Sequence, residues 1–356
     1  MSDVRSALML VSANADARLR AEVEEGVRPC PDFLRLEQRY GVNLLDWTAL
    51  RHSAGQRCGS QSLRHVAAAR SRLRGFAAIL SDGEHVGIPL ALFLRIWGRR
   101  RPRHVVIGHH LLGRSKGVMF RRLGAHRGMD CLIVHSPNQV PIVHEQLGVP
   151  ERLLCVVPYG VDTDFWSPQG SEAEEEALIV SAGREHRDYR SLVEGCADLG
   201  PMFIADASPH SPGAHRAQPE VWPDHVVRRG LDPVELRRRY ARATVVAVPV
   251  LASPFPFGIT TLLEAMSMGK AVVASGTEGL RGIVDDGETG LVVAPGDPAA
   301  MRTAVADLLA DPEKRRRLGQ AARQTAIEQY GLDLYVDRLA HHLGLVGATL
   351  AGGRPA

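Results

Sequence analysis

The sequence predicts an α/β protein built from two doubly wound domains, and three observations support this. The chain has 356 residues, about twice the length of a typical single domain. Short apolar runs alternate with helix-length amphipathic segments from end to end, which is typical of parallel β-α-β units. The turn-rich stretch 158–168 interrupts this alternation near the middle of the chain and divides it into two series.

Each series contains short apolar runs that we interpret as strands. In the first series these are Ala7–Ser12, Asn43–Asp46, Phe76–Leu80, Val105–Ile107, Cys131–Val134 and Leu154–Val157. In the second series they are Leu178–Ser181, Met202–Ala205, Val226–Val227, Val245–Val248, Ala271–Ala274 and Gly290–Val293. Helices are expected between them, for example at Gly87–Trp97, Pro137–Leu147 and Asp232–Ala243. Because crossovers between parallel strands are right-handed, the helices should cover both faces of each sheet.

We place the first domain at residues 1–158 and the second at residues 159–332. The boundary falls where the turn-rich stretch runs into the acidic residues 172–176, before the next strand. Residues 333–356 follow as a further helix and a tail from residue 344 onward. The tail is rich in glycine and other small residues and is expected to fray.

No segment reaches the roughly 20 consecutive apolar residues of a membrane-spanning helix. The longest candidate, 88–98, contains Arg95. The apolar run 7–11 follows Asp3 and Arg5 and is too short for the core of a signal peptide. We therefore expect a cytoplasmic protein.

The chain contains five cysteines, none in a C-x-x-C arrangement: Cys30, Cys58, Cys131, Cys155 and Cys196. Their odd number and scattered spacing predict a reducing compartment, with neither a disulfide framework nor a zinc site. No cluster of histidine, aspartate or glutamate suggests a metal either, so no metal ion is expected.

The net charge of +3 conceals two halves of opposite sign. Residues 1–160 hold 23 basic and 13 acidic residues, whereas the remainder holds 20 and 27. Arginine carries almost all of the positive charge, with clusters at 95–103 and 237–239. No helix-turn-helix or zinc motif accompanies these clusters, so we expect no nucleic-acid partner. Peripheral contact between the basic first half and an anionic membrane surface stays open.

The segment 254–275 carries the strongest local pattern: a Gly-containing loop, a helix that begins near Thr260 or Thr261, and a turn at Gly269 into a buried strand. The free N–H groups and the positive dipole end of such a helix favour an anion. Glu264 falls one turn inside the helix, where a carboxylate can reach the ribose of a nucleotide whose phosphates lie at the helix end. The pattern also fits an ordinary αβ unit whose glutamate complements the helix dipole.

This segment resembles the nucleotide-sugar-binding signature of the retaining GT-B glycosyltransferases of the family 4 group. The usual signature is a glutamate, Phe-Gly, apolar residues, a second glutamate, Ala-Met and a glycine before a strand. The segments 236–249 and 279–297 resemble the family's sequence on either side of the signature, and 157–165 resembles its interdomain linker. The similarity is collinear over residues 150–335.

The resemblance implies two Rossmann-like domains that face each other across a cleft, with the helix after Tyr330 crossing back to the first domain. The second domain would hold a nucleoside-diphosphate sugar, UDP- or GDP-linked. The first would hold an acceptor, either a small metabolite or a saccharide. The expected reaction is sugar transfer with retention by front-face displacement, without a metal ion or other cofactor, in a monomer or a homodimer.

By resemblance, one set of residues binds the donor: Arg184, Arg187, Gly258, Ile259, Thr260, Thr261 and Glu264. Glu264 would take the ribose, and the helix start and the arginines would hold the diphosphate, because guanidinium groups form paired hydrogen bonds with phosphate. The first of these arginines would also be catalytic, by stabilising the leaving diphosphate. Two positions depart from the family. Pro256 replaces the first glutamate, which contacts the sugar, and Tyr189 replaces a diphosphate-binding lysine, for which Arg187 or Arg190 can substitute.

In the first half, His109 and His110 follow directly after a predicted strand, at the edge where open α/β sheets bind ligands. By resemblance His109 faces the donor sugar and is catalytic. His110, from its place after the strand, is a candidate for contact with the acceptor, and a histidine here can also be purely structural. Glu84 begins a helix and either acts on the acceptor as a catalytic group or caps that helix. Arg114 and Lys116 either face the acceptor or belong to a solvated basic loop.

Other functions stay open: a non-catalytic nucleotide-sugar-binding protein, a GT-B-like sugar epimerase, and a phosphorylase. The departures at Pro256 and Tyr189 favour the binding protein, because both remove expected ligands. A phosphorylase that uses pyridoxal phosphate needs a dedicated lysine, and the chain has only Lys116, Lys270 and Lys314. Asp162 and Asp164 spell the D-x-D pattern of metal-dependent transferases, but they fall in the linker and are expected to form a turn.

Overall fold

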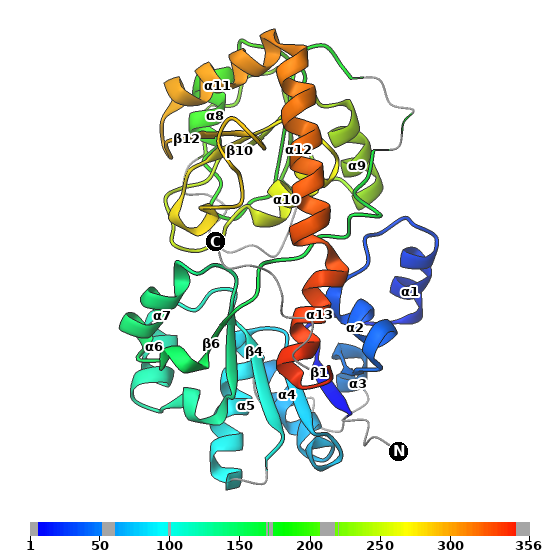
Figure 1. The fold of residues 1–356 in the computed structure, drawn as a ribbon, viewed down its shortest axis with the longest axis vertical. Coiled ribbons are helices and arrows are strands. Elements are labelled where there is room, and N and C mark those ends of the chain that lie inside the picture. The colour runs from blue at the N-terminus through cyan, green and yellow to red at the C-terminus, as the bar shows by residue number, and fades with distance from the viewer. Residues whose placement is uncertain are drawn as a thin grey trace. The chain divides into compact units, whose positions relative to one another are not determined.

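The computed structural model describes residues 6–51, 61–98, 101–168, 170, 174–206, 218, 219 and 221–346. Of these, residues 6–25, 30–158 and 332–346 belong to one compact unit, and residues 26–29 and 159–331 belong to a second. The last helix, α13 (Leu332–Leu343), is part of the first unit although it follows the second along the chain (Figure 1). The predicted fraying tail lies outside the described residues from residue 347 onward.

The first unit is built on a six-stranded parallel sheet in the order β2-β1-β3-β4-β5-β6. Its strands are β1 (Ala7–Leu10), β2 (Asn43–Leu45), β3 (Ala78–Ser81), β4 (Arg103–Ile107), β5 (Cys131–Val134) and β6 (Leu154–Val156). Besides α13, its helices are α1 (Ala17–Glu24), α2 (Asp32–Tyr40), α3 (Trp47–Arg51), α4 (Gln61–Arg70), α5 (Glu84–Trp97), α6 (Arg114–Arg121) and α7 (Gln139–Leu147). Alternate strand residues pack on opposite faces: Met9 lies in the core with α2 and α13, and Leu8 in the core with α4 and α5.

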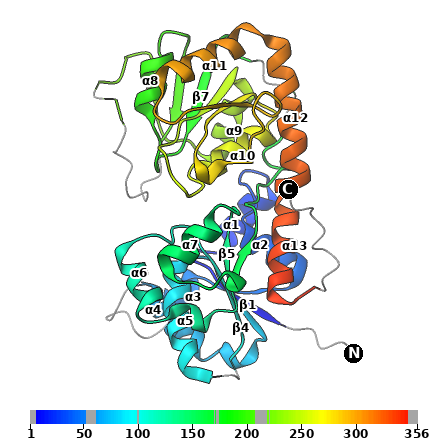
Figure 2. The ribbon, with the colours of Figure 1, turned by 60° about the vertical axis from the view of Figure 1, so that its left-hand side comes forward.

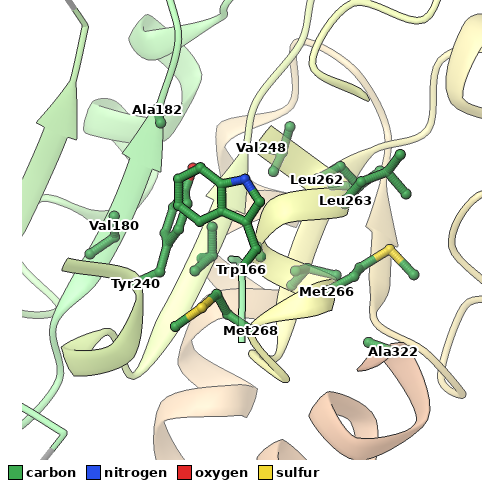
Figure 3. Packing of buried hydrophobic residues seen from close by; sticks show 14 of the residues in the cluster. Trp166, Val180, Ala182, Tyr240, Val248, Leu262, Leu263, Met266, Met268 and Ala322 are labelled. Carbon is green, nitrogen blue, oxygen red and sulfur yellow. The ribbon is translucent and has the colours of Figure 1, made fainter. Parts of the chain in front are cut away.

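The second unit repeats this construction with the strand order β12-β11-β10-β7-β8-β9. Its strands are β7 (Ile179–Ala182), β8 (Met202–Ala205), β9 (Val226–Arg228), β10 (Val245–Val248), β11 (Val272–Ser275) and β12 (Leu291–Val293). Its helices are α8 (Tyr189–Cys196), α9 (Pro233–Arg242), α10 (Ile259–Ser267), α11 (Pro298–Ala310) and α12 (Pro312–Tyr330), and Figure 2 gives a second view. In the core formed with α9, α10 and α12, Trp166 lies against Tyr240 with ring centroids 5.7 Å apart (Figure 3).

Both units confirm the predicted α/β class. Each predicted strand is present, with ends within two residues of the expected ones, and helices cover both faces of each sheet. Each sheet has one pair of adjacent central strands whose following connections run toward opposite edges of the sheet. These pairs are β1/β3 and β7/β10. Such switch points open a crevice at the carboxyl ends of the strands, where ligands bind.

Two other expectations have different outcomes. The turn at the D-x-D sequence is confirmed, because the Asp162 carboxylate accepts hydrogen bonds from the backbone N–H groups of Asp164 (3.2 Å) and Phe165 (3.1 Å). The expectation that no cysteines pair is wrong, because Cys131 and Cys155 form a disulfide. The two cysteines are 24 residues apart in sequence, and they come together because β5 and β6 are adjacent strands.

Within the described residues, no helix combines the length and apolar character needed to cross a membrane.

We predict that Gly319→Ala destabilises the second unit. Gly319 lies in α12, and a Cβ there would come within 2.1 Å of the carbonyl oxygen of Gly269 in the turn after α10, so α12 would have to move away from that end of α10. Overpacking of this kind costs about 1–3 kcal/mol, which a thermal melt would report as a lower Tm.

The matched control is Gly117→Ala in α6, where a Cβ meets nothing within 4 Å. Alanine is favoured over glycine in a helix by about 1 kcal/mol, so this variant should be as stable as the wild type or slightly more so. If Gly319→Ala melted at the same temperature as Gly117→Ala, the close packing of α10 and α12 would be contradicted.

Candidate functional site

Two loops leave the switch point of the second sheet, residues 183–188 after β7 and residues 249–258 after β10. They are joined by backbone hydrogen bonds from Asp188 N–H to the Pro249 carbonyl (3.1 Å) and from Leu251 N–H to the His186 carbonyl (2.9 Å). The His186 ring also stacks on Phe257, with centroids 3.7 Å apart. The two loops therefore form one continuous surface at the edge where a ligand is expected.

Arg187 lies beneath this surface and is only 5% exposed. Its guanidinium group donates from Nε to the Ala182 carbonyl (2.8 Å), from Nη1 to the Glu185 carbonyl (3.0 Å) and from Nη2 to Thr261 Oγ1 (2.9 Å). In the part of the chain that the structure describes, no carboxylate forms an ion pair with it. A buried cation without a direct ion pair is costly, so the site favours an anionic ligand.

Two glycines make room for the guanidinium group. A Cβ on Gly183 would lie 2.3 Å from Arg187 Nη2, and a Cβ on Gly258 would lie 3.4 Å from Arg187 Nη1 and 2.9 Å from a methyl group of Val250. Both glycines also have positive φ, 93° and 88°, which a residue with a side chain rarely adopts. Gly258 is the N-cap of α10 and has no side-chain cap hydrogen bond, so the positive end of this helix is open to an anion next to Arg187.

Glu264 follows on α10, and its carboxylate accepts a hydrogen bond from the hydroxyl of the buried Tyr240 (3.1 Å). Burial raises the pKa of Glu264 to about 7, against the opposing effects of Tyr240 and of the Arg187 charge. The carboxyl group therefore changes protonation state near neutral pH.

The structure brings some of the expected donor-binding residues into contact and leaves others further away. Arg187, Gly258 and Thr261 lie in direct contact, with Ile259 and Thr260 in the same helical turn, and Glu264 is further along the helix. Arg184 is half-buried in the loop after β7, and Arg190 is exposed on α8. Tyr189 is fully buried and donates its hydroxyl to the Gly183 carbonyl, and burial raises its pKa to about 12. Tyr189 thus holds the loop after β7 through the Gly183 carbonyl, from the core side of the loop.

The first unit has its own polar cluster, at the switch point between β1 and β3. Ser12, just after β1, donates its hydroxyl to Asp82 Oδ1 (2.8 Å), just after β3, and lies 2.7 Å from His85 Nε2. The Ser12 N–H also donates to the Asp82 carboxylate. We did not predict Ser12 as a site residue; its position at a strand end was the available signal.

Glu84 is 5% exposed, and both of its oxygens have partners. Oε1 accepts from Lys116 Nζ (2.6 Å), and Oε2 accepts from the His109 N–H (3.0 Å). Although burial alone would raise the pKa of Glu84, the hydrogen bond and charge of Lys116 lower it to about 2. Glu84 is therefore ionised at neutral pH and fixes the backbone at His109.

The His109 ring is held on two sides. Its Nε2 is hydrogen-bonded to the Asp82 carbonyl (2.9 Å), and the ring stacks near His135 with centroids 5.5 Å apart. Burial, together with repulsion from His109, lowers the pKa of His135 to about 3, so that His135 is neutral. The carbonyl of His110 accepts a hydrogen bond from Lys116. The prediction for Arg114 concerns a side chain outside the described part of the structure.

Comparison with known proteins points to one family. Residues 216–325 match the model of the glycosyl transferases group 1 family. A GDP-mannose-dependent alpha-(1-6)-phosphatidylinositol monomannoside mannosyltransferase of Mycolicibacterium smegmatis is 38% identical over 51% of this chain and 53% of its own length. The alpha-maltose-1-phosphate synthase of the same organism is 37% identical over 51% and 54%. The chain thus spans about half the length of the curated relatives it matches.

Solved structures agree over nearly the whole chain. Sucrose-phosphate synthase from Thermosynechococcus elongatus superposes with a TM-score of 0.71 at 17% identity, covering 95% of this chain and 98% of that one. Anabaena HepE in complex with UDP-glucose gives 0.68 at 16% identity, covering 96% and 100%. At such identities the likeness establishes the fold. Residues 216–325 are therefore similar to the glycosyl transferases group 1 family, and the chain that carries them has the GT-B fold.

Proposed function

We propose that this chain is a glycosyltransferase that moves a sugar from a nucleoside-diphosphate sugar, UDP- or GDP-linked, to a hydroxyl-bearing acceptor. The observation that carries the proposal is Arg187, a buried guanidinium group without a carboxylate partner, placed beside the open N-terminus of α10. Two cationic features at one strand edge are matched by a diphosphate. The names of the mannosyltransferase and of the UDP-glucose complex support the same donor class.

In the proposed complex, the diphosphate is held by Arg187, by Arg184 and by the first turn of α10. The ionised Glu264 carboxylate accepts hydrogen bonds from the ribose hydroxyls, and Tyr240 orients this carboxylate. These groups act most strongly on the leaving diphosphate, because its negative charge grows as the bond to the sugar breaks. The arginines and the helix dipole supply this stabilisation without a metal ion.

The proposed reaction retains the anomeric configuration by front-face displacement, in which the leaving phosphate accepts the proton of the acceptor hydroxyl. His109 is the residue of the first unit that we assign to the sugar. His109 is held by the Asp82 carbonyl, by Glu84 and by His135. We therefore assign Glu84 a positioning role, in which it acts through His109. Ser12, Asp82 and His85 lie at the strand edge assigned to the acceptor.

A second candidate function is a protein that binds a nucleotide sugar without transferring it. Pro256 stands where the family's first glutamate contacts the sugar, and Tyr189 is buried where a lysine would meet the diphosphate. The two candidates separate in one assay. Release of UDP or GDP from a panel of nucleotide sugars, with and without acceptors, supports the transferase, and tight binding without any release favours the binding protein.

We predict that Arg187→Ala weakens binding of UDP and GDP by roughly 10- to 150-fold, since hydrogen bonds to charged groups contribute about 1.5–3 kcal/mol. Isothermal titration calorimetry in the presence of EDTA measures this effect and the metal independence together. The control is Arg190→Ala, which removes an exposed arginine from α8. An equal loss in both variants, or wild-type binding abolished by EDTA, would contradict the proposed donor site.

We also predict that the wild type binds UDP more tightly as the pH rises from 6 to 8. The carboxylate form of Glu264 accepts hydrogen bonds from the ribose, and its pKa of about 7 leaves this form in the minority at pH 6. The gain is at most about tenfold. UDP itself titrates in this range, so Glu264→Gln measured at the same pH values gives the baseline. A pH dependence identical in the two proteins would refute the role of Glu264.

Finally, His109→Ala should reduce turnover of the nucleotide sugar by at least about tenfold, the scale of about 1.4 kcal/mol in the barrier, while the Kd for UDP or GDP changes little. The reason is that the nucleotide contacts are assigned to the second unit alone. Glu84→Gln should lower turnover in the same direction through loss of the Lys116 contact and of the support for His109. An unchanged rate together with weakened UDP binding would reverse the assignment.

A further inference from the structure

A group of soft metal ligands in the first unit lies apart from the residues assigned above. Cys131 of β5, Cys155 of β6 and His342 of α13 each offer one ligand atom, and these atoms all lie within 4.8 Å of one another. Tetrahedral zinc with bonds of about 2.3 Å to sulfur and 2.0–2.1 Å to nitrogen needs ligand atoms about 3.4–3.8 Å apart. The three ligand atoms are therefore within reach of one ion once the two sulfurs, which are bonded to each other in the structure, separate.

The fold positions all three side chains. The cysteines belong to adjacent parallel strands and lie on the sheet face that α13 covers. His342 is in the last turn of α13, and its carbonyl oxygen accepts a hydrogen bond from Arg103 Nε of β4 (2.6 Å). Cys131 is fully buried, whereas Cys155 and His342 are partly exposed, so an ion can reach the site from solvent.

We propose that, when Cys131 and Cys155 are reduced, they and His342 bind a thiophilic divalent metal ion of the zinc class. In the structure the two sulfurs are joined as a disulfide. Reduction by a thiol or phosphine adds two electrons and two protons, and metal binding then displaces the two thiol protons, since the ligands are thiolates. Among the described residues no fourth histidine, cysteine or carboxylate joins the group, so the fourth position goes to water. The ion would fasten α13 to β5 and β6.

The test uses the full-length protein reduced with a phosphine and titrated with Co²⁺ and Zn²⁺. We expect one ion per chain, a near-ultraviolet thiolate-to-Co²⁺ charge-transfer band that Zn²⁺ abolishes, and a higher Tm with Zn²⁺ than with EDTA. Cys155→Ser and His342→Gln should each weaken binding at least tenfold. Both positions are partly exposed, so these variants should fold, and circular dichroism verifies this.

Cys196→Ser is the matched control, because Cys196 is a buried free cysteine in the second unit. It should bind the metal like the wild type. Absence of binding by the reduced wild type would overturn the proposal and leave the pair as a disulfide only. Binding that survives in both Cys155→Ser and His342→Gln would place the metal elsewhere and would also overturn it.

Discussion

The second unit depends on a buried positive charge. Arg187 connects the end of β7, its own loop and the first turn of α10 through three hydrogen bonds from one guanidinium group. The first turn of α10 is distant in sequence from β7 and its loop, and a planar donor with several N–H groups reaches both at once. The same residue that joins the elements carries a charge that forms no ion pair within the described residues. Arg187 thus both holds these elements together and gives the site its preference for an anion.

The first unit has the same kind of switch point, but the charged group there is a carboxylate where the second unit has an arginine. At its switch point a carboxylate, Asp82, connects Ser12 after β1 with the loop after β3, and its carbonyl oxygen holds His109. Glu84 continues this support from the start of α5. Two doubly wound sheets therefore present different chemistry at equivalent edges, because the residues that follow each strand differ while the strand order imposes the same crevice.

The sequence predicted the strands because their apolar runs are short and are bounded by turn residues, and it predicted the α10 region because glycine and glutamate spacings there are local. Three features escaped prediction. Ser12 meets Asp82 only through the order of strands, which sequence spacing does not encode. The Cys131–Cys155 pair is hidden for the same reason. Tyr189 appeared to be a replaced ligand, yet its side chain points into the core, and side-chain direction at a loop-to-helix junction depends on packing around it.

Net charge also fails to predict the charge of the site. The first half of the chain has an excess of arginine, but some of its described arginines form ion pairs elsewhere than at the carboxyl ends of the strands, as in Arg39–Asp337 and Arg101–Asp130. The edge itself carries carboxylates. Burial, together with repulsion from the nearby Asp82, raises the pKa of Asp32 to about 6, so a negative charge at Asp32 is disfavoured. An anionic acceptor would meet the same repulsion. Under the proposed function, the local electrostatics therefore favour a neutral hydroxyl-bearing acceptor at this edge, despite the basic composition of the surrounding half.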